Sequence, residues 1–377
     1  QAESVLSNDD QATPVPATAT LYVDAAAGGA SNGTSWTDAY VHLQDALDST
    51  NTNPYTQYTV QLAEGVYYPD QDQDGDHVAD DTTESFVIEA DNLQLEGGYP
   101  TGGGARDPST NLTVLSGDIT QDDTDGDGDG VIAQGSDIAG NNANHVLDLT
   151  SPSPFTPNTK ISGVTITAGQ SSRDGGGALI AAVRLESGEV VKRPSFVNVR
   201  FQGNVAEEGG GAVGISALDG SEASPLFENV VFRANQSKNI GGAVGNFARR
   251  GGTTRPRFNR VTFRANKASF GGAVFNQASG STLETRMAPL FVNVVFRGNR
   301  AQTRGGAVFE FGTGTKGQTT SLFTNVLFHN NSAGDNGGAI YLGTPALAED
   351  KNAGTTSSTF TNVTIVGNTA GQLGGGI

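Results

Sequence analysis

The chain has 377 residues, 52 of them glycine, and Asn, Thr and Ser recur throughout. This composition favours many short strands joined by tight turns. The absence of cysteine excludes disulfide bridges and thiolate metal sites, and no segment approaches the roughly 18 apolar residues of a membrane-spanning helix. Residues 1–159 carry 27 acidic residues against Arg106 alone, whereas residues 160–377 carry 13 acidic and 21 basic residues. The acidic half repels itself unless cations neutralise it, so divalent cations are expected partners and nucleic acid is not.

The N-terminal residues predict a leader followed by a capping helix. Residues 1–20 start without an initiator Met and end in QATPVPATAT, which predicts a flexible leader, a signal peptide already removed, and export to the cell surface or beyond. In TSWTDAYVHLQDAL, Ser35 and Asp38 form a capping-box-like pair. An amphipathic helix here would cover the open end of the first coil. Its apolar face would contain Trp36, Tyr40, Leu43 and Leu47.

The rest of residues 21–159 predicts an acidic cap and first coils, in which short strands alternate with Asp-rich loops. The strand candidates are YTVQLAEG, SFVIEA, LQLEGG, LTVLSG and HVLDLT. The first loop, DQDQDGDHVADD, has alternating Asp and a Gly for the sharp turn, so its carboxylates can converge on one hard cation such as Ca²⁺. Its candidate ligands are Asp70, Asp72, Asp74, Asp76, Asp80 and Asp81.

A second candidate calcium loop, DDTDGDGDGV, follows within the acidic half. Its candidate ligands are Asp123, Asp125, Asp127 and Asp129, separated mainly by glycines. No acidic residue stands at the twelfth position counted from Asp123 or Asp125, where an EF-hand has its bidentate Glu, although Asp137 is near. Calcium binding at both loops is the prediction, and a solvated acidic surface is the alternative.

Residues 160–377 contain a repeat of 31 to 37 residues. Its copies run from FVNVRFQGN to FTNVTIVGN and start at Phe196, Phe227, Phe258, Phe291, Phe323 and Phe360. A Gly pair follows each copy, at Gly210, Gly241, Gly271, Gly305, Gly337 and Gly374. Each copy is rich in β-branched and aromatic residues and lacks helical periodicity, so the unit is a coil of short strands.

The spacing within a copy predicts three corners per coil. Side chains alternate along a strand, so Phe227 and Phe232 can both face inward only if the chain bends between them, near Asn229. A second Asn series, represented by Asn235, marks another corner, and the Gly pairs supply a third. The predicted fold is therefore an all-β, right-handed parallel β-helix of roughly ten coils, with Phe stacks inside and Asn ladders at the corners.

Arginines occupy one equivalent position in three successive coils. We expect them to point outward about 4.8 Å apart, an unfavourable spacing for like charges unless anions or carboxylates lie between them. The stripe is a candidate site for an anionic glycan, with a solvated or locally paired ladder as the alternative. Its members are Arg233, Arg264 and Arg297, flanked by Gln202 and His329.

The pair of motifs F-x-x-N and GGA[IV] resembles the repeat of chlamydial polymorphic outer-membrane proteins. The opening LYVDAAAGGASNGTSWTDAYVHLQDAL is also similar to large secreted β-helix proteins of environmental bacteria, and together the resemblance covers about residues 21–377. It implies a bacterial β-helix exported to the cell surface, often an adhesin or an autotransporter passenger. It does not imply an activity, because such repeats form scaffold.

The predicted function is therefore structural or adhesive, with a cell-surface or extracellular glycan or protein as ligand. Polysaccharide lyase or hydrolase activity and carbohydrate binding are the alternatives. The four histidines form no apparent acid–base constellation, and Arg106 is the one base near the acidic loops. We predict no catalytic residue.

Two further expectations concern surfaces. The variable segments after the Gly pairs are expected to project from one side and to form the binding face. They are 214–224, 245–255, 275–288, 309–321 and 341–358. The sequence stops inside a coil at Ile377, which favours either further chain in the native protein or head-to-tail stacking of copies into filaments.

Overall fold

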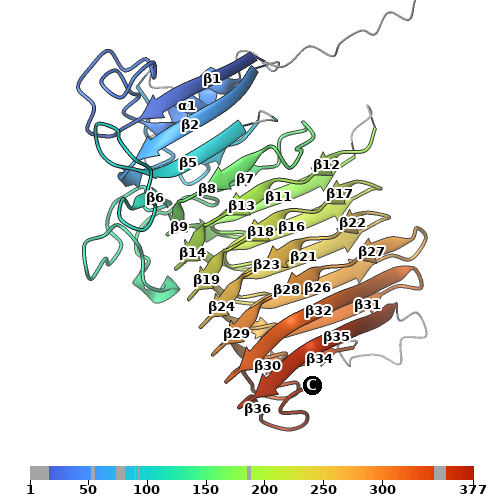
Figure 1. Cartoon of the computed structure of the whole chain (residues 1–377). Coiled ribbons are helices and arrows are strands. Elements are labelled where there is room, and N and C mark those ends of the chain that lie inside the picture. The colour runs from blue at the N-terminus through green and yellow to red at the C-terminus, as the bar shows by residue number, and fades with distance from the viewer. Residues whose placement is uncertain are drawn as a thin grey trace, which may run out of the picture.

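The computed structural model describes residues 17–51, 56–73, 81–89, 91, 93–184, 188–343 and 354–377. In these ranges the chain is a parallel β-solenoid of about nine turns, running in Figure 1 from blue N-terminal coils to red C-terminal coils. This confirms the predicted all-β parallel β-helix, with about nine turns in place of ten. Strand β1 (Ala17–Val23) begins inside the expected leader and pairs with β2 (Thr56–Ala63).

The strands of the described residues form three parallel sheets. The first contains, after β1 and β2, β3 (Gly65–Tyr67), β5 (Leu93–Tyr99), β6 (Thr113–Ser116), β8 (Lys160–Ser162), β9 (Thr165–Thr167), β12 (Val191–Lys192), β13 (Ser195–Val197), β14 (Arg200–Gln202), β17 (Glu222–Ala223), β18 (Leu226–Glu228), β19 (Val231–Arg233), β22 (Thr253–Thr254), β23 (Arg257–Asn259), β24 (Thr262–Arg264), β27 (Thr285–Met287), β28 (Leu290–Val292), β29 (Val295–Arg297), β32 (Gly317–His329) and β35 (Thr355–Val366). The second contains β10 (Gln170–Ser171), β15 (Val205–Ala206), β20 (Gln236–Ser237), β25 (Lys267–Phe270), β30 (Arg300–Arg304), β33 (Ser332–Ala333) and β36 (Thr369–Ala370). The third contains β4 (Phe86–Val87), β7 (Leu147–Leu149), β11 (Ala178–Val183), β16 (Val213–Leu218), β21 (Val244–Arg249), β26 (Val274–Ser279), β31 (Val308–Thr313) and β34 (Ile340–Leu342).

Two phenylalanine stacks fill the interior, as predicted. Each Phe pairs in register with its equivalent one coil away, for example Phe227 with Phe258 and Phe232 with Phe263. The rings of Phe232 and Phe263 are parallel, with centroids 4.8 Å apart. All the predicted inward rings are buried except Phe360, which is partly buried against the same core. Repetition of one residue in one register thus produces a continuous apolar column.

Both predicted Asn corners are present, but they differ in burial. At the first, between β18 and β19, Asn229 has a φ of 54°, and Arg260 adopts the same left-handed conformation in the next coil. The Asn side chains of this first corner form hydrogen bonds from coil to coil at the surface, as Asn325 does to Asn293. At the second corner Asn266 is fully buried, its Oδ1 accepts from the backbone N–H and the amide of Asn235, and its Nδ2 donates to a Phe carbonyl.

The Gly pairs form the third corner for a steric reason. Gly305 has a φ of 67°, and a Cβ there would lie 2.3 Å from the carbonyl oxygen of Val308. Only glycine tolerates both conditions. The chain then enters the third sheet, so the predicted position of the Gly corner is correct.

The variable segments are strands over much of their length and are joined by short turns, so they belong to the wall of the solenoid rather than forming long insertions. That they form a binding face stays a prediction. Segments 214–224 and 245–255 lie almost wholly in or between β16, β17, β21 and β22, with only short turns between strands. In β31, Val308 and Glu310 are buried on the inner face, while Phe309 and Phe311 form a separate aromatic cluster with Phe275 on the other face. Residues 344–353 lie outside the described residues.

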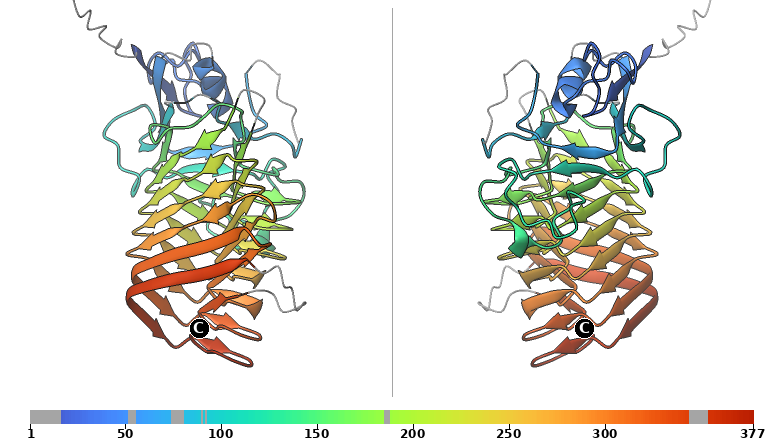
Figure 2. Two further views of the ribbon diagram at one scale, coloured as in Figure 1. Left: turned by 90° about the vertical axis from the view of Figure 1, so that its right-hand side faces the viewer. Right: turned by 90° about the vertical axis from the view of Figure 1, so that its left-hand side faces the viewer.

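The capping helix is shorter than expected. Helix α1 (Leu43–Thr50) contributes Leu43 and Leu47 to the core and sits at the N-terminal end of the solenoid (Figure 2). Ser35 and Asp38 do bond to each other, with the Asp38 N–H 3.1 Å from Ser35 Oγ, but they close a turn before the helix. Trp36 instead packs against Tyr22 and Tyr99, because tertiary contacts outweigh a helical pattern this short. No helix in the described ranges is long and apolar enough to cross a membrane.

Candidate acidic-loop site

The second Asp-rich loop lies against the outside of the solenoid. Residues 117–143 leave the first sheet after β6, and Figure 2 shows this green segment beside the coils. The Ile132 N–H donates to Thr167 Oγ1 at 3.0 Å, and its carbonyl accepts from Gln202 Nε2 at 3.3 Å. Ile132 is itself buried. These contacts fix the loop to strands β9 and β14, which belong to the next two coils.

A first group of three carboxylates stands at the base of the loop. Carboxylate oxygens of Asp118, Asp122 and Asp123 all lie within 4.8 Å of one another. Asp118 accepts the N–H groups of Asp122 and Asp123, and Asp123 accepts from the Ala139 N–H and Asn142 Nδ2. Burial raises the pKa of Asp123 to about 6 and also raises the pKa of Asp118. The group is therefore electrostatically unfavourable as three free anions.

A second group forms the tip of the loop. Carboxylate oxygens of Asp125, Asp127 and Asp129 again lie within 4.8 Å of one another. Burial tends to raise the pKa of Asp125, but the N–H groups of Gly130 and Gly128, at 2.7 and 3.0 Å, outweigh it and the pKa is lowered. The negative charge of Asp129 raises the pKa of Asp127. Converging carboxylates on a Gly-rich turn are the donor set that Ca²⁺ takes.

The structure divides the predicted second loop. Asp125, Asp127 and Asp129 come together, but Asp123 joins Asp118 and Asp122, two residues outside the predicted ligand set. The sequence does hold a signal for this group, because Asp118 precedes the pair Asp122 and Asp123 by four residues. The division arises because the Asp123 carboxylate turns inward to bond residues 139 and 142.

The first Asp-rich loop is described only in part. Asp74, Asp76 and Asp80 lie outside the described residues. Asp70 is 6% exposed, and the Oδ1 of Asp81 accepts the N–H and hydroxyl of Thr83, which lower the pKa of Asp81. Calcium binding at this loop stays a prediction.

The arginine stripe exists in the predicted register. Arg233 pairs with Arg264, which pairs with Arg297, and Gln202 and His329 flank them. All three arginine side chains are exposed. Within the described ranges, none of the ion pairs at 4.0 Å or less involves these arginines. The stripe thus carries three neighbouring positive charges at one strand spacing.

One end of this stripe meets the acidic loop. A pocket of about 250 Å³ is lined by Asp127 and Asp129 from the loop and by Arg200, Gln202 and Arg233 from β14 and β19. Arg200 was not among the predicted site residues. Its position two residues before Gln202 was the available signal, since alternate residues of a strand share a face.

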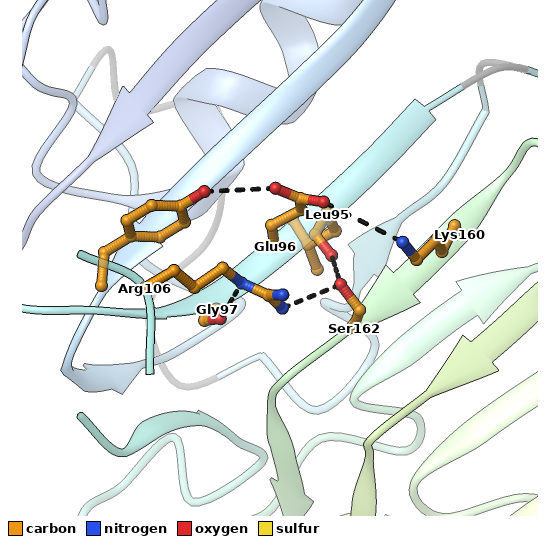
Figure 3. A network of polar contacts seen from close by, with 7 residues as sticks. Leu95, Glu96, Gly97, Arg106, Lys160 and Ser162 are labelled. Atoms are coloured by element: carbon orange, nitrogen blue, oxygen red, sulfur yellow. Dashed lines mark hydrogen bonds and ion pairs between the residues drawn. The ribbon is translucent and has the colours of Figure 1, made fainter. Parts of the chain in front are cut away.

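Arg106, the one basic residue of the acidic half, has a structural role (Figure 3). Its Nε donates to the Gly97 carbonyl at 2.9 Å and its Nη2 donates to Ser162 Oγ at 3.0 Å. Ser162 Oγ in turn donates to the carbonyl of Leu95. These bonds connect the segment after β5 to the coil of β8, so the guanidinium is held by backbone and hydroxyl oxygens.

Comparison with known proteins gives one match. The model of the Chlamydia polymorphic membrane protein repeat matches residues 325–343. This segment contains the corner residues Asn325 and Asn331, the inward Phe328 and the Gly pair at Gly337. No curated protein and no solved structure shows significant similarity to the chain.

Proposed function

Because the chain is a parallel β-helix with repeats of the polymorphic membrane protein type, we propose that it is a bacterial cell-surface binding protein whose acidic N-terminal half is stabilised by calcium. The observation that carries the calcium proposal is the convergence of two groups of three carboxylates on one loop. A divalent cation bound there offsets their mutual repulsion. A cation that binds only the folded state also raises stability by mass action.

The adhesive role is supported by the matched repeat and by the character of the fold. A solenoid offers a long surface whose equivalent positions repeat once per coil. The ligand we propose is an extracellular glycan or protein. Polysaccharide cleavage is the alternative function, and a cleavage assay run beside a glycan and cell-surface binding screen separates the two.

Calcium binding is tested by thermal unfolding in the presence of calcium or of a chelator. We expect chelation to lower the melting temperature of the unaltered protein. Replacing Asp127→Asn together with Asp129→Asn should reduce this difference, because two of the three carboxylates at the loop tip lose their charge while Asp118, Asp122 and Asp123 keep theirs.

A matched control removes the same charge elsewhere in the acidic half. Glu64→Gln with Glu89→Gln changes two carboxylates that belong to neither group of three. This double variant should keep the full calcium-dependent shift. An equal loss of the shift in both double variants would mean that calcium acts through general charge screening, and no shift in the unaltered protein would mean that the loop is a solvated acidic surface.

A further inference from the structure

The pocket between the acidic loop and the solenoid combines charges of opposite sign. Its loop side carries Asp127 and Asp129, and its solenoid side carries Arg200 and Arg233. In the described residues no ion pair of 4.0 Å or less joins these two sides. Facing charges that do not pair directly leave room for a ligand that contacts both.

Gln202 provides an independent indication of a ligand. Its side chain lines the pocket and is 5% exposed. Its Nε2 donates to the Ile132 carbonyl, but its buried Oε1 has no hydrogen-bond partner among the described residues. A buried acceptor left unsatisfied costs about 1–3 kcal/mol. The oxygen is closed to solvent in this structure, so a hydroxyl donor or a cation in the pocket would satisfy it once the amide turns toward the pocket.

Arg200 also lines a second, larger groove. This groove of about 400 Å³ runs past Ser109, Asn198 and Asn229. The Asn side chains there belong to the exposed corner ladder and are linked to each other. The pocket has room for one sugar-sized group, and the groove offers amides and a hydroxyl to neighbouring units of a chain.

From this arrangement we infer that the pocket binds a carboxylated saccharide of the uronic acid type, held jointly by calcium and arginine. The inference rests on the proposed calcium site. The ligand's carboxylate completes the oxygen shell of an ion bound by Asp127 and Asp129, and it accepts paired hydrogen bonds from a guanidinium. A sugar hydroxyl donates to Gln202 Oε1. Neither the loop nor the arginine stripe supplies this combination alone.

The test is calorimetric titration with trigalacturonic acid, with neutral maltotriose as the control saccharide. We expect the acidic trisaccharide to bind in calcium, and to bind at least about tenfold more weakly in chelator or to the double variant Arg200→Gln, Arg233→Gln, because each change removes a charged partner. The matched control is Arg264→Gln with Arg297→Gln, which removes the same charge from the stripe outside the pocket. That variant should bind as the unaltered protein does.

Calcium binding is measured separately by terbium luminescence without saccharide, so that the two proposals fail distinguishably. Ion binding without trisaccharide binding overturns the present inference and leaves the calcium site standing, whereas absence of ion binding overturns both. Equal weakening in the two arginine variants assigns the ligand to the stripe and overturns the pocket. Trisaccharide binding that does not change with chelator, or maltotriose binding of equal affinity, also overturns the inference.

Melting curves check that each variant folds. The double variant Arg200→Lys, Arg233→Lys keeps the charge but loses the bidentate fork, so it should bind the trisaccharide with intermediate affinity.

Discussion

A fully buried carboxyl group marks the interior of the C-terminal coils. Glu310 accepts hydrogen bonds from Asn276 Nδ2 at 2.8 Å, Ser321 Oγ at 2.5 Å and Ser358 Oγ at 2.7 Å. Burial raises its pKa, although these three donors act in the opposite direction. A carboxyl with a raised folded-state pKa binds its proton more tightly in the folded than in the unfolded chain. Its contribution to stability is therefore greatest below the unfolded pKa and is lost as the pH rises through the folded pKa.

The first prediction is that Glu310→Gln raises the free energy of unfolding at pH 7. The amide keeps the shape of the acid, its oxygen still accepts from Asn276 and Ser321, and its NH2 group donates to the hydroxyl oxygen of Ser358. It also removes the cost of a buried charge. In urea unfolding from pH 4 to pH 8, the free energy of unfolding should decline less for this variant than for the unaltered protein. Glu284→Gln is the matched control, since Glu284 is an exposed partner of Lys316. A less stable Gln variant at pH 7 would show that the ionised form is the one the network stabilises.

At the scale of the element, the two Asn ladders share a residue type and a spacing but differ in what they satisfy. Asn266 satisfies buried backbone groups, accepting from the Asn235 N–H and donating to the Phe232 carbonyl. Asn293 accepts from Asn325 at 3.2 Å on the surface, where water can replace the bond. The tolerance of the exposed series is visible at Arg260, which breaks the ladder without changing the left-handed corner.

The second prediction follows from that difference. Asn266→Ala should cost at least about 2 kcal/mol more than Asn293→Ala, because it orphans several buried polar groups at about 1–3 kcal/mol each. Denaturant unfolding measures both values. Equal costs would mean that water reaches the inner corner, and hydrogen exchange at Asn235 would then be fast in the unaltered protein.

At the scale of the molecule, each coil depends on its two neighbours. Phe263 stacks on Phe232 and Phe296 with both centroid distances at 4.8 Å. Phe360 stacks on Phe323 and is only partly buried. Stability is therefore expected to vary along the solenoid as a sum of nearest-neighbour contacts.

The third prediction is that Phe263→Ala costs about 3–5 kcal/mol, as large-to-small changes of buried Phe do, and that Phe360→Ala costs less than half as much. Equilibrium unfolding of the two variants measures this. Similar costs at both positions would mean that the last described coil is covered in solution. Head-to-tail stacking, which would provide such a cover, stays a prediction, and fibres in electron micrographs would be its direct sign.

The repeat by itself determined the β-helix, the inward Phe columns and the positions of the Asn and Gly corners. A pattern repeated once per coil in parallel register fixes the position of each residue type within the coil. Phe227 therefore stacks on Phe258, and Gly305 takes the positive φ of the corner. Tertiary structure decided what is not repeated. Trp36 packs against Tyr22 outside the expected helix, and Asp123 groups with Asp118 and Asp122 instead of Asp125. The acidic loop lies beside Arg200 and Arg233. Those outcomes depend on contacts between segments that sequence spacing does not relate, because the loop at residues 117–143 docks on strands β9, β14 and β19, which form later in the chain.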